Sequence, residues 1–141
     1  MTGVSQDSIF VAVFFGAFLL VTAGEIYWLT SKLQVPVKKA LTVVLLSNFG
    51  TITLGFFVTF VIFGLLLALT AENAGVGGTG TWLAFIAALA FPFLLMAGVR
   101  RLLIGGMRIE QVARPLPYAL LSSLIFFAAV FGIPGIFLAL R

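Results

Sequence analysis

The sequence of 141 residues contains no cysteine and no histidine, and only 9% of its residues are charged. The lack of cysteine excludes disulfides, thiol chemistry and iron–sulfur ligation, and the lack of histidine removes the usual zinc and haem ligands. Only four Asp and Glu residues are present, and no nucleophile lies beside a base. We therefore expect no metal, no cofactor and no enzymatic activity.

Hydrophobic residues make up 62% of the chain, and the mean hydropathy is +1.28. Soluble domains average about 45–50% apolar and about 25% charged residues. A domain of this size cannot bury so many apolar side chains in its own core, so lipid is the expected solvent. The net charge of +4 does not indicate a nucleic-acid partner, because the basic residues lie near helix ends, where they face lipid headgroups.

Long apolar runs predict an all-α integral membrane protein, one domain over residues 1–141, with four transmembrane helices. Each predicted span is long enough to cross a hydrocarbon core of about 30 Å at ~1.5 Å per residue. The spans are expected at about 8–29, 37–69, 81–99 and 116–140. The first run has no Lys or Arg before it, so we expect a membrane helix and not a cleaved signal peptide.

Seven of the eight Lys and Arg residues fall in the first and third connections between these spans. This bias predicts two basic cytoplasmic loops, with both termini and the glycine-rich connection 71–80 outside a bacterial inner (plasma) membrane. The residues expected to contact anionic headgroups or partner proteins are Lys32, Lys38, Lys39, Arg100, Arg101, Arg108 and Arg114. The expected interface anchors are Tyr27, Trp28 and Trp82.

The segment 107–114 belongs to the second basic loop and follows two glycines. We expect it to form a short interfacial helix whose arginines reach headgroups. A phosphate-binding site or a partner-docking surface is the alternative.

Two polar residues lie inside the predicted spans and form a candidate pair. Glu25 precedes Lys32 by seven residues, about 10 Å along a helix, and Asn48 follows Lys39 by nine, about 13 Å. An antiparallel hairpin places both at a similar depth, where the Asn48 amide is expected to donate to the carboxylate. A structural clasp is the main interpretation, since such bonds contribute ~0.6 kcal/mol on average. A proton- or cation-coupling role, or an assembly contact, remains open.

The predicted spans also contain two internal prolines and several phenylalanines. Pro92 and Pro134 are expected to kink their helices, because each removes a backbone hydrogen bond. The kinks are expected to shape the bundle, and use of the freed carbonyls as cation ligands is the alternative. The phenylalanines near the centre of the second span are expected to face lipid or a partner, with a phenylalanine-lined pore as the alternative.

Two families offer partial resemblances. The run SNFGTITLGF (47–56) loosely resembles part of the second helix of fluoride channels, and a glutamate in the first span resembles that of small multidrug transporters. The third-helix motif of the channels and the rest of the transporter pattern are missing. Neither family is therefore assigned.

The expected function is that of a non-catalytic structural or accessory subunit of a larger membrane complex. Short loops and many Phe and Gly residues available for packing favour it. The expected partners are anionic lipids and other membrane subunits or further copies of the chain. The main alternative is a small oligomeric ion or solute transporter or channel that uses Glu25 and Asn48. A lipid-modifying protein, or one that binds lipid or pigment, is the third possibility.

Overall fold

The computed structural model describes residues 5–74 and 79–140. Its helices are α1 (Gln6–Ser31), α2 (Val37–Gly50), α3 (Phe56–Ala74), α4 (Thr79–Gly106) and α5 (Pro115–Ala139), and the π-helical turn η1 (Thr51–Gly55) joins α2 to α3. The stretches long and apolar enough to span a membrane are Gln6–Ser31, Val37–Leu69, Phe85–Gly106 and Pro115–Ala139. The prediction of an all-helical chain with four helices long and apolar enough to span a membrane is therefore confirmed.

The helix starts follow from local sequence. The Ser5 side chain caps α1 by accepting a hydrogen bond from the Ser8 backbone N–H (3.3 Å), and Asp7 in the first turn complements the helix dipole. Pro36 lies directly before α2, and Pro115 occupies the first position of α5, where a missing N–H costs nothing. The glycine-rich connection predicted over 71–80 is shorter than expected, because α3 continues to Ala74 and α4 begins at Thr79. Residues 75–78 lie outside the described part.

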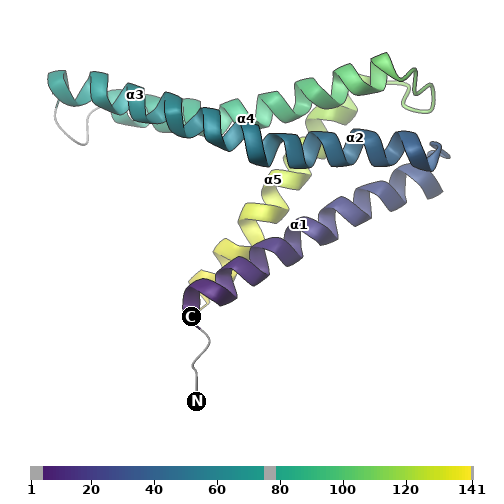
Figure 1. Cartoon of the computed structure of the whole chain (residues 1–141), viewed down its shortest axis with the longest axis horizontal. Coiled ribbons are helices and arrows are strands. Elements are labelled where there is room, and N and C mark those ends of the chain that lie inside the picture. Colours follow the sequence, from purple (N-terminus) through teal and green to yellow (C-terminus); the bar gives the residue numbers. More distant parts are fainter. Residues whose placement is uncertain (1–4, 75–78, 141) are drawn as a thin grey trace.

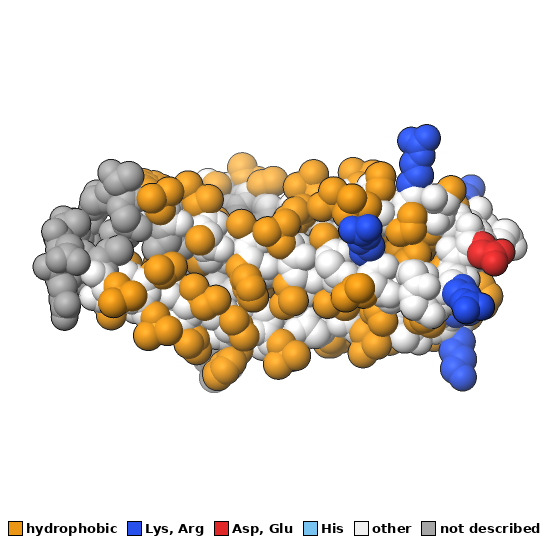
Figure 2. All heavy atoms as spheres, turned by 90° about the horizontal axis from the view of Figure 1, so that it is seen from above, with side chains coloured by type: hydrophobic (Ala, Val, Ile, Leu, Met, Phe, Trp, Pro, Cys, Tyr) orange, Lys and Arg blue, Asp and Glu red, His pale blue; other side chains and the backbone are white. Residues whose placement is uncertain are grey.

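The four spans converge at one end and separate toward the other (Figure 1). The pair α1 and α5 packs together, as does the pair α3 and α4, and α5 also packs against α4. Within the described residues, α3 packs mainly against α4 and η1. It reaches α5 through its first residue, Phe56, whose ring centroid lies 5.7 Å from that of Phe131. The bundle is therefore closed where the connections 32–36 and 107–114 lie, and it opens toward the chain termini. Lys and Arg gather toward the closed end (Figure 2), which we call the basic end.

A hydrophobic cluster closes the basic end. It includes Leu29 from α1, Val43 from α2 and Ile104 from α4, and it also takes up Ile109 and Val112 from the connection after α4. This connection consists of turns, so the predicted interfacial helix over 107–114 is wrong. The physical reason is that Ile109 and Val112 are buried in the bundle, which holds the segment against the helix ends.

The turn η1 fits closely against α4. A Cβ atom added at Gly55 would lie 3.3 Å from Thr51 Cγ2, 3.4 Å from Leu95 Cδ2 and 3.6 Å from Pro92 Cβ. Only glycine leaves this space free, so the π-helical turn and the proline of α4 can approach each other. Pro92 is buried inside α4, and Pro134 is buried inside α5.

The third span ends later than the sequence predicts. The expected end near residue 99 placed Arg100 in a loop, whereas α4 continues to Gly106. Arg100 therefore lies within the helix, about 9 Å before its end at ~1.5 Å per residue. This shift of boundary determines the candidate site.

Candidate functional site

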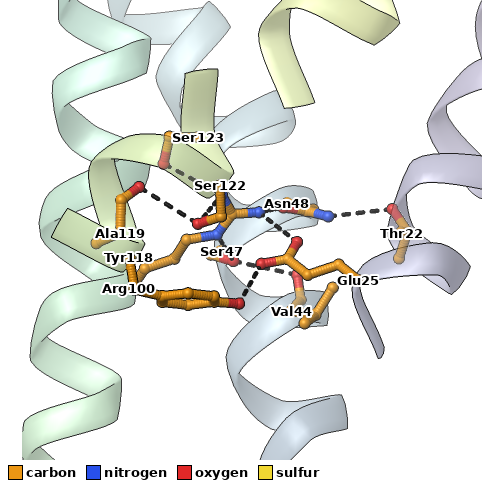
Figure 3. Close-up of polar contacts among 10 residues, drawn as sticks. All are labelled: Thr22, Glu25, Val44, Ser47, Asn48, Arg100, Tyr118, Ala119, Ser122 and Ser123. Carbon is orange, nitrogen blue, oxygen red and sulfur yellow. Dashed lines mark hydrogen bonds and ion pairs between the residues drawn. The ribbon is translucent and has the colours of Figure 1, made fainter. Parts of the chain in front are cut away.

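Arg100 is the largest fully buried side chain of the described residues, with 0% of its surface exposed. Its position in α4 directs the guanidinium between the other three spans (Figure 3). The prediction that Arg100 contacts lipid headgroups is therefore wrong. The reason is that α1, α2 and α5 supply enough acceptors to replace the water that a charged guanidinium would otherwise require.

Each of the five N–H groups of Arg100 has an acceptor, and these come from α1, α2 and α5. Nε donates to Ser47 Oγ (3.2 Å), Nη1 donates to Ser122 Oγ (2.9 Å) and Ser123 Oγ (3.2 Å), and Nη2 donates to Glu25 Oε2 (2.7 Å) and Asn48 Oδ1 (2.6 Å). A guanidinium has five donors in all. One side chain thus ties all four spans together, and its hydrogen-bonding capacity is fully used.

Further hydrogen bonds hold the acceptors in place. Tyr118 Oη of α5 donates to Glu25 Oε1 (2.7 Å), and Asn48 Nδ2 of α2 donates to Thr22 Oγ1 of α1 (3.1 Å). The Tyr118 ring also stacks on Trp28, with ring centroids 5.9 Å apart and planes 4° apart. The carboxylate is thus fixed from α4 and α5 at once, and α1 is bonded to each of the other spans.

The pair of Glu25 and Arg100 makes the site electrically neutral. The side chains are 9% and 0% exposed, and their charged atoms lie 2.7 Å apart. Taking charges out of water costs several kcal/mol per ion, so a buried pair persists only with close geometry and additional hydrogen bonds. Both conditions hold here. The pair can therefore persist in the interior of the bundle.

The structure brings Glu25 and Asn48 to one site, but they are not bonded as the sequence suggested. The Asn48 amide donates to Thr22, and its oxygen accepts from the Arg100 nitrogen that also binds Glu25. The expected direct bond between the amide and the carboxylate is therefore wrong. A positive charge is a better partner for both oxygen atoms than an amide, since charge-assisted hydrogen bonds are about twice as strong.

The other residues singled out from the sequence lie outside this network. The side chains of Lys32, Lys38, Arg101, Arg108 and Arg114 are exposed, and Lys39 is half-buried. Exposed aromatic residues include Tyr27, Trp28 and Trp82. Their contacts with headgroups and with the membrane interface stay predictions.

A groove opens laterally beside the network, between α1 and α5. It encloses about 450 Å³. Its lining residues are Leu20, Val21, Gly24, Glu25, Trp28, Tyr118, Leu121, Ser122 and Ile125. Glu25, Tyr118 and Ser122 thus take part in the Arg100 network and also face this groove.

Two further cavities lie in the half of the bundle that is splayed apart, and both are lined mainly by phenylalanine. The larger, of about 500 Å³, lies between α3, α4 and α5, and the smaller, of about 360 Å³, between α1, the segment from η1 to α3, and α5. Phe56, Phe60 and Phe131 line both cavities. We call this pair of cavities the phenylalanine groove.

Within the described residues, no group of three or more His, Cys, Asp or Glu side chains is placed to hold a metal ion. The Arg100 network can bind, orient and hold helices together. Its one carboxylate is the group that can still accept hydrogen bonds from a ligand.

The comparisons with known proteins found no matching family model, curated protein or solved structure.

Proposed function

We propose that this chain is a non-catalytic accessory subunit of a larger membrane complex, and that the phenylalanine groove receives a transmembrane helix of a partner. The observation that carries the proposal is the separation of the two helix pairs away from the basic end. Protein interiors are close-packed, and helices of one small bundle ordinarily fill the space between them. Here α3 touches α5 at Phe56, and the rest of its length follows α4 away from α1 and α5 (Figure 1).

The Arg100 network supports a structural role. All five donors of the guanidinium are engaged, and the only carboxylate of the network is paired with it. A coupling residue in a transporter must exchange its proton or ion during the cycle. Release of Glu25 from Arg100 would leave a positive charge buried and unpaired. The geometry therefore suits a permanent structural contact better than a contact that breaks in every transport cycle.

The phenylalanine groove suits a helix because it is apolar and open to the side. Aromatic side chains bring large contact areas and are enriched where proteins meet. Phe60 is 72% exposed in the isolated chain, and Phe10, Phe85 and Phe131 are also exposed. A partner helix that fills the space gains van der Waals contact, which is the main force between helices in lipid.

The partner is tested by purifying the tagged chain from its native membranes in mild detergent. We expect one protein in fixed ratio to the chain, and we expect Ala128→Trp to remove it because Ala128 is exposed and lines the groove. Ala12→Trp is the matched control, since Ala12 is exposed on α1 and lines neither cavity of the groove. A homodimer alone, or binding that survives Ala128→Trp, would contradict the proposal and favour transport.

The proposed setting is a bacterial inner membrane with the basic end in the cytoplasm, in line with the positive-inside rule. The chain contains no cysteine, so a single introduced cysteine is the only thiol of the chain that a maleimide can label. We expect a membrane-impermeant maleimide to label Ser5→Cys on intact cells or spheroplasts, and to label Gln111→Cys only after the membrane is opened. The reverse pattern would show that the orientation is inverted.

A further inference from the structure

The lateral groove between α1 and α5 has a polar end and an apolar end. Glu25, Tyr118 and Ser122 lie toward the basic end, whereas Leu20 and Ile125 lie deeper in the bilayer. This gradient follows from the opposite directions of α1 and α5, which bring the late residues of α1 beside the early residues of α5. An amphipathic lipid in the leaflet at the basic end is arranged in the same way, with its polar headgroup near the basic end and its hydrocarbon chain deeper.

Hydrogen-bonding capacity remains at the polar end. A carboxylate offers about four acceptor positions, and among the described residues Glu25 accepts from Arg100 and Tyr118. Its side chain is 9% exposed and lines the groove. The Ser122 hydroxyl bonds to the Ala119 carbonyl at 3.4 Å, a long bond that can be exchanged for a ligand oxygen.

We infer that this groove binds an uncharged lipid with a free hydroxyl headgroup, such as a diacylglycerol or a long-chain prenol. The hydroxyl donates to Glu25 Oε1 and accepts from Ser122 Oγ, and the hydrocarbon lies on Leu20, Leu121 and Ile125. Trp28, stacked on Tyr118, forms the wall near the polar end. The volume of about 450 Å³ is within the range of about 300–1,000 Å³ typical of small-ligand sites.

The charge of the site selects a neutral headgroup. Glu25 and Arg100 compensate each other, so a phosphate or an amine brought into the groove would have no counter-ion and would lose its hydration. A hydroxyl, by contrast, can satisfy both its donor and its acceptor positions. The inference does not depend on the partner helix, because the phenylalanine groove is lined by other residues.

Photolabelling of the purified chain in phosphatidylcholine nanodiscs tests this inference. The probes are a diacylglycerol and a farnesol that each carry a diazirine, and a phosphatidylcholine with the same diazirine acyl chain. We expect at least one hydroxyl lipid to label the segments 20–28 and 118–125 about fivefold more than the phosphatidylcholine, as hydrogen bonds of ordinary strength imply. The lipid that labels identifies whether the hydroxyl comes from a diacylglycerol or a prenol.

Two glycines of α1 provide a matched pair of variants. Gly24 lines the groove, Gly16 does not, and a Cβ atom added at either meets no atom within 4 Å. We expect Gly24→Leu to reduce labelling by the hydroxyl lipid to the level of phosphatidylcholine, and Gly16→Leu to leave it unchanged. Equal labelling by all three probes, no labelling, or labelling unaffected by Gly24→Leu would overturn the inference.

Competition on the unaltered chain provides a second measurement that needs no variant. Unlabelled lipid with the active headgroup is expected to displace the probe, whereas its O-methyl ether, which cannot donate a hydrogen bond, is expected to displace it about fivefold less effectively. Equal displacement by the alcohol and the ether would overturn the inference.

Discussion

Glu25→Leu is expected to lower the free energy of unfolding by about 3–5 kcal/mol, the cost typical of breaking a buried ion pair by removing one partner. Arg100 would keep its charge at a position with 0% exposure, and Tyr118 would lose the acceptor of its hydroxyl. Unfolding is measured by titrating SDS into the protein in mild detergent, with tryptophan fluorescence as the signal. Trp28 stacks on Tyr118, so its emission reports on the site itself.

The double variant Glu25→Leu/Arg100→Leu separates loss of the pair from loss of one charge. It is expected to be more stable than Glu25→Leu alone, because no unpaired charge remains and apolar replacements of buried pairs are often tolerated. Two of the former acceptors keep a hydrogen bond, since Ser47 bonds to the Val44 carbonyl and the Asn48 amide bonds to Thr22. Glu110→Leu is the control for loss of an exposed carboxylate. A double variant at least as unstable as Glu25→Leu would contradict a paired role.

The number of spans could be predicted from the sequence because long apolar runs separated by basic or glycine-rich connections have few other readings. The main error concerned the end of the third span. A pair of adjacent arginines predicts the start of a loop, but the apolar residues 102–104 continue the helix to the two glycines that end it. That short run was the available signal that Arg100 lies inside the span.

The composition of the network could be predicted only in part. Glu25 and Asn48 were recognisable because polar residues in a span are costly and need a reason. Arg100 and Tyr118 were not, since their role depends on which faces of α4 and α5 turn inward, and these helices are apolar on every side. Contacts separated by 75 residues (Arg100 to Glu25) and 93 residues (Tyr118 to Glu25) are set by packing, which no local pattern records.

The same limitation applies to the opening between the helix pairs. The sequence predicts spans but not their angles, and splaying depends on where neighbouring helices stop touching. The close fit of Gly55 against Pro92 joins η1 to α4, whereas α5, which also packs against α4, runs toward the start of α1 on the other side of the opening (Figure 1). Because the network lies near the basic end alone, it holds the four spans there and leaves the rest of their length free to diverge.

Arg100→Lys is expected to destabilise the chain by about 3 kcal/mol, although it preserves the charge. Lysine has three donors on one nitrogen, so at least two of the five acceptors lose a bond, and hydrogen bonds to charged groups contribute about 1.5–3 kcal/mol each. Arg101→Lys is the matched control, because the neighbouring side chain is exposed and a solvated arginine exchanges with lysine at little cost. Both variants are compared by the same SDS titration.

The comparison between these neighbours tests geometry separately from charge. If the network needed only a positive charge opposite Glu25, Arg100→Lys would behave like Arg101→Lys, and that result would contradict the role assigned to the planar guanidinium. The expected gap arises because the acceptors lie on three different helices, and a single ammonium group cannot reach all of them at hydrogen-bonding distance. A large destabilisation by Arg100→Lys but not by Arg101→Lys would therefore indicate that the five donors of the planar guanidinium join the spans.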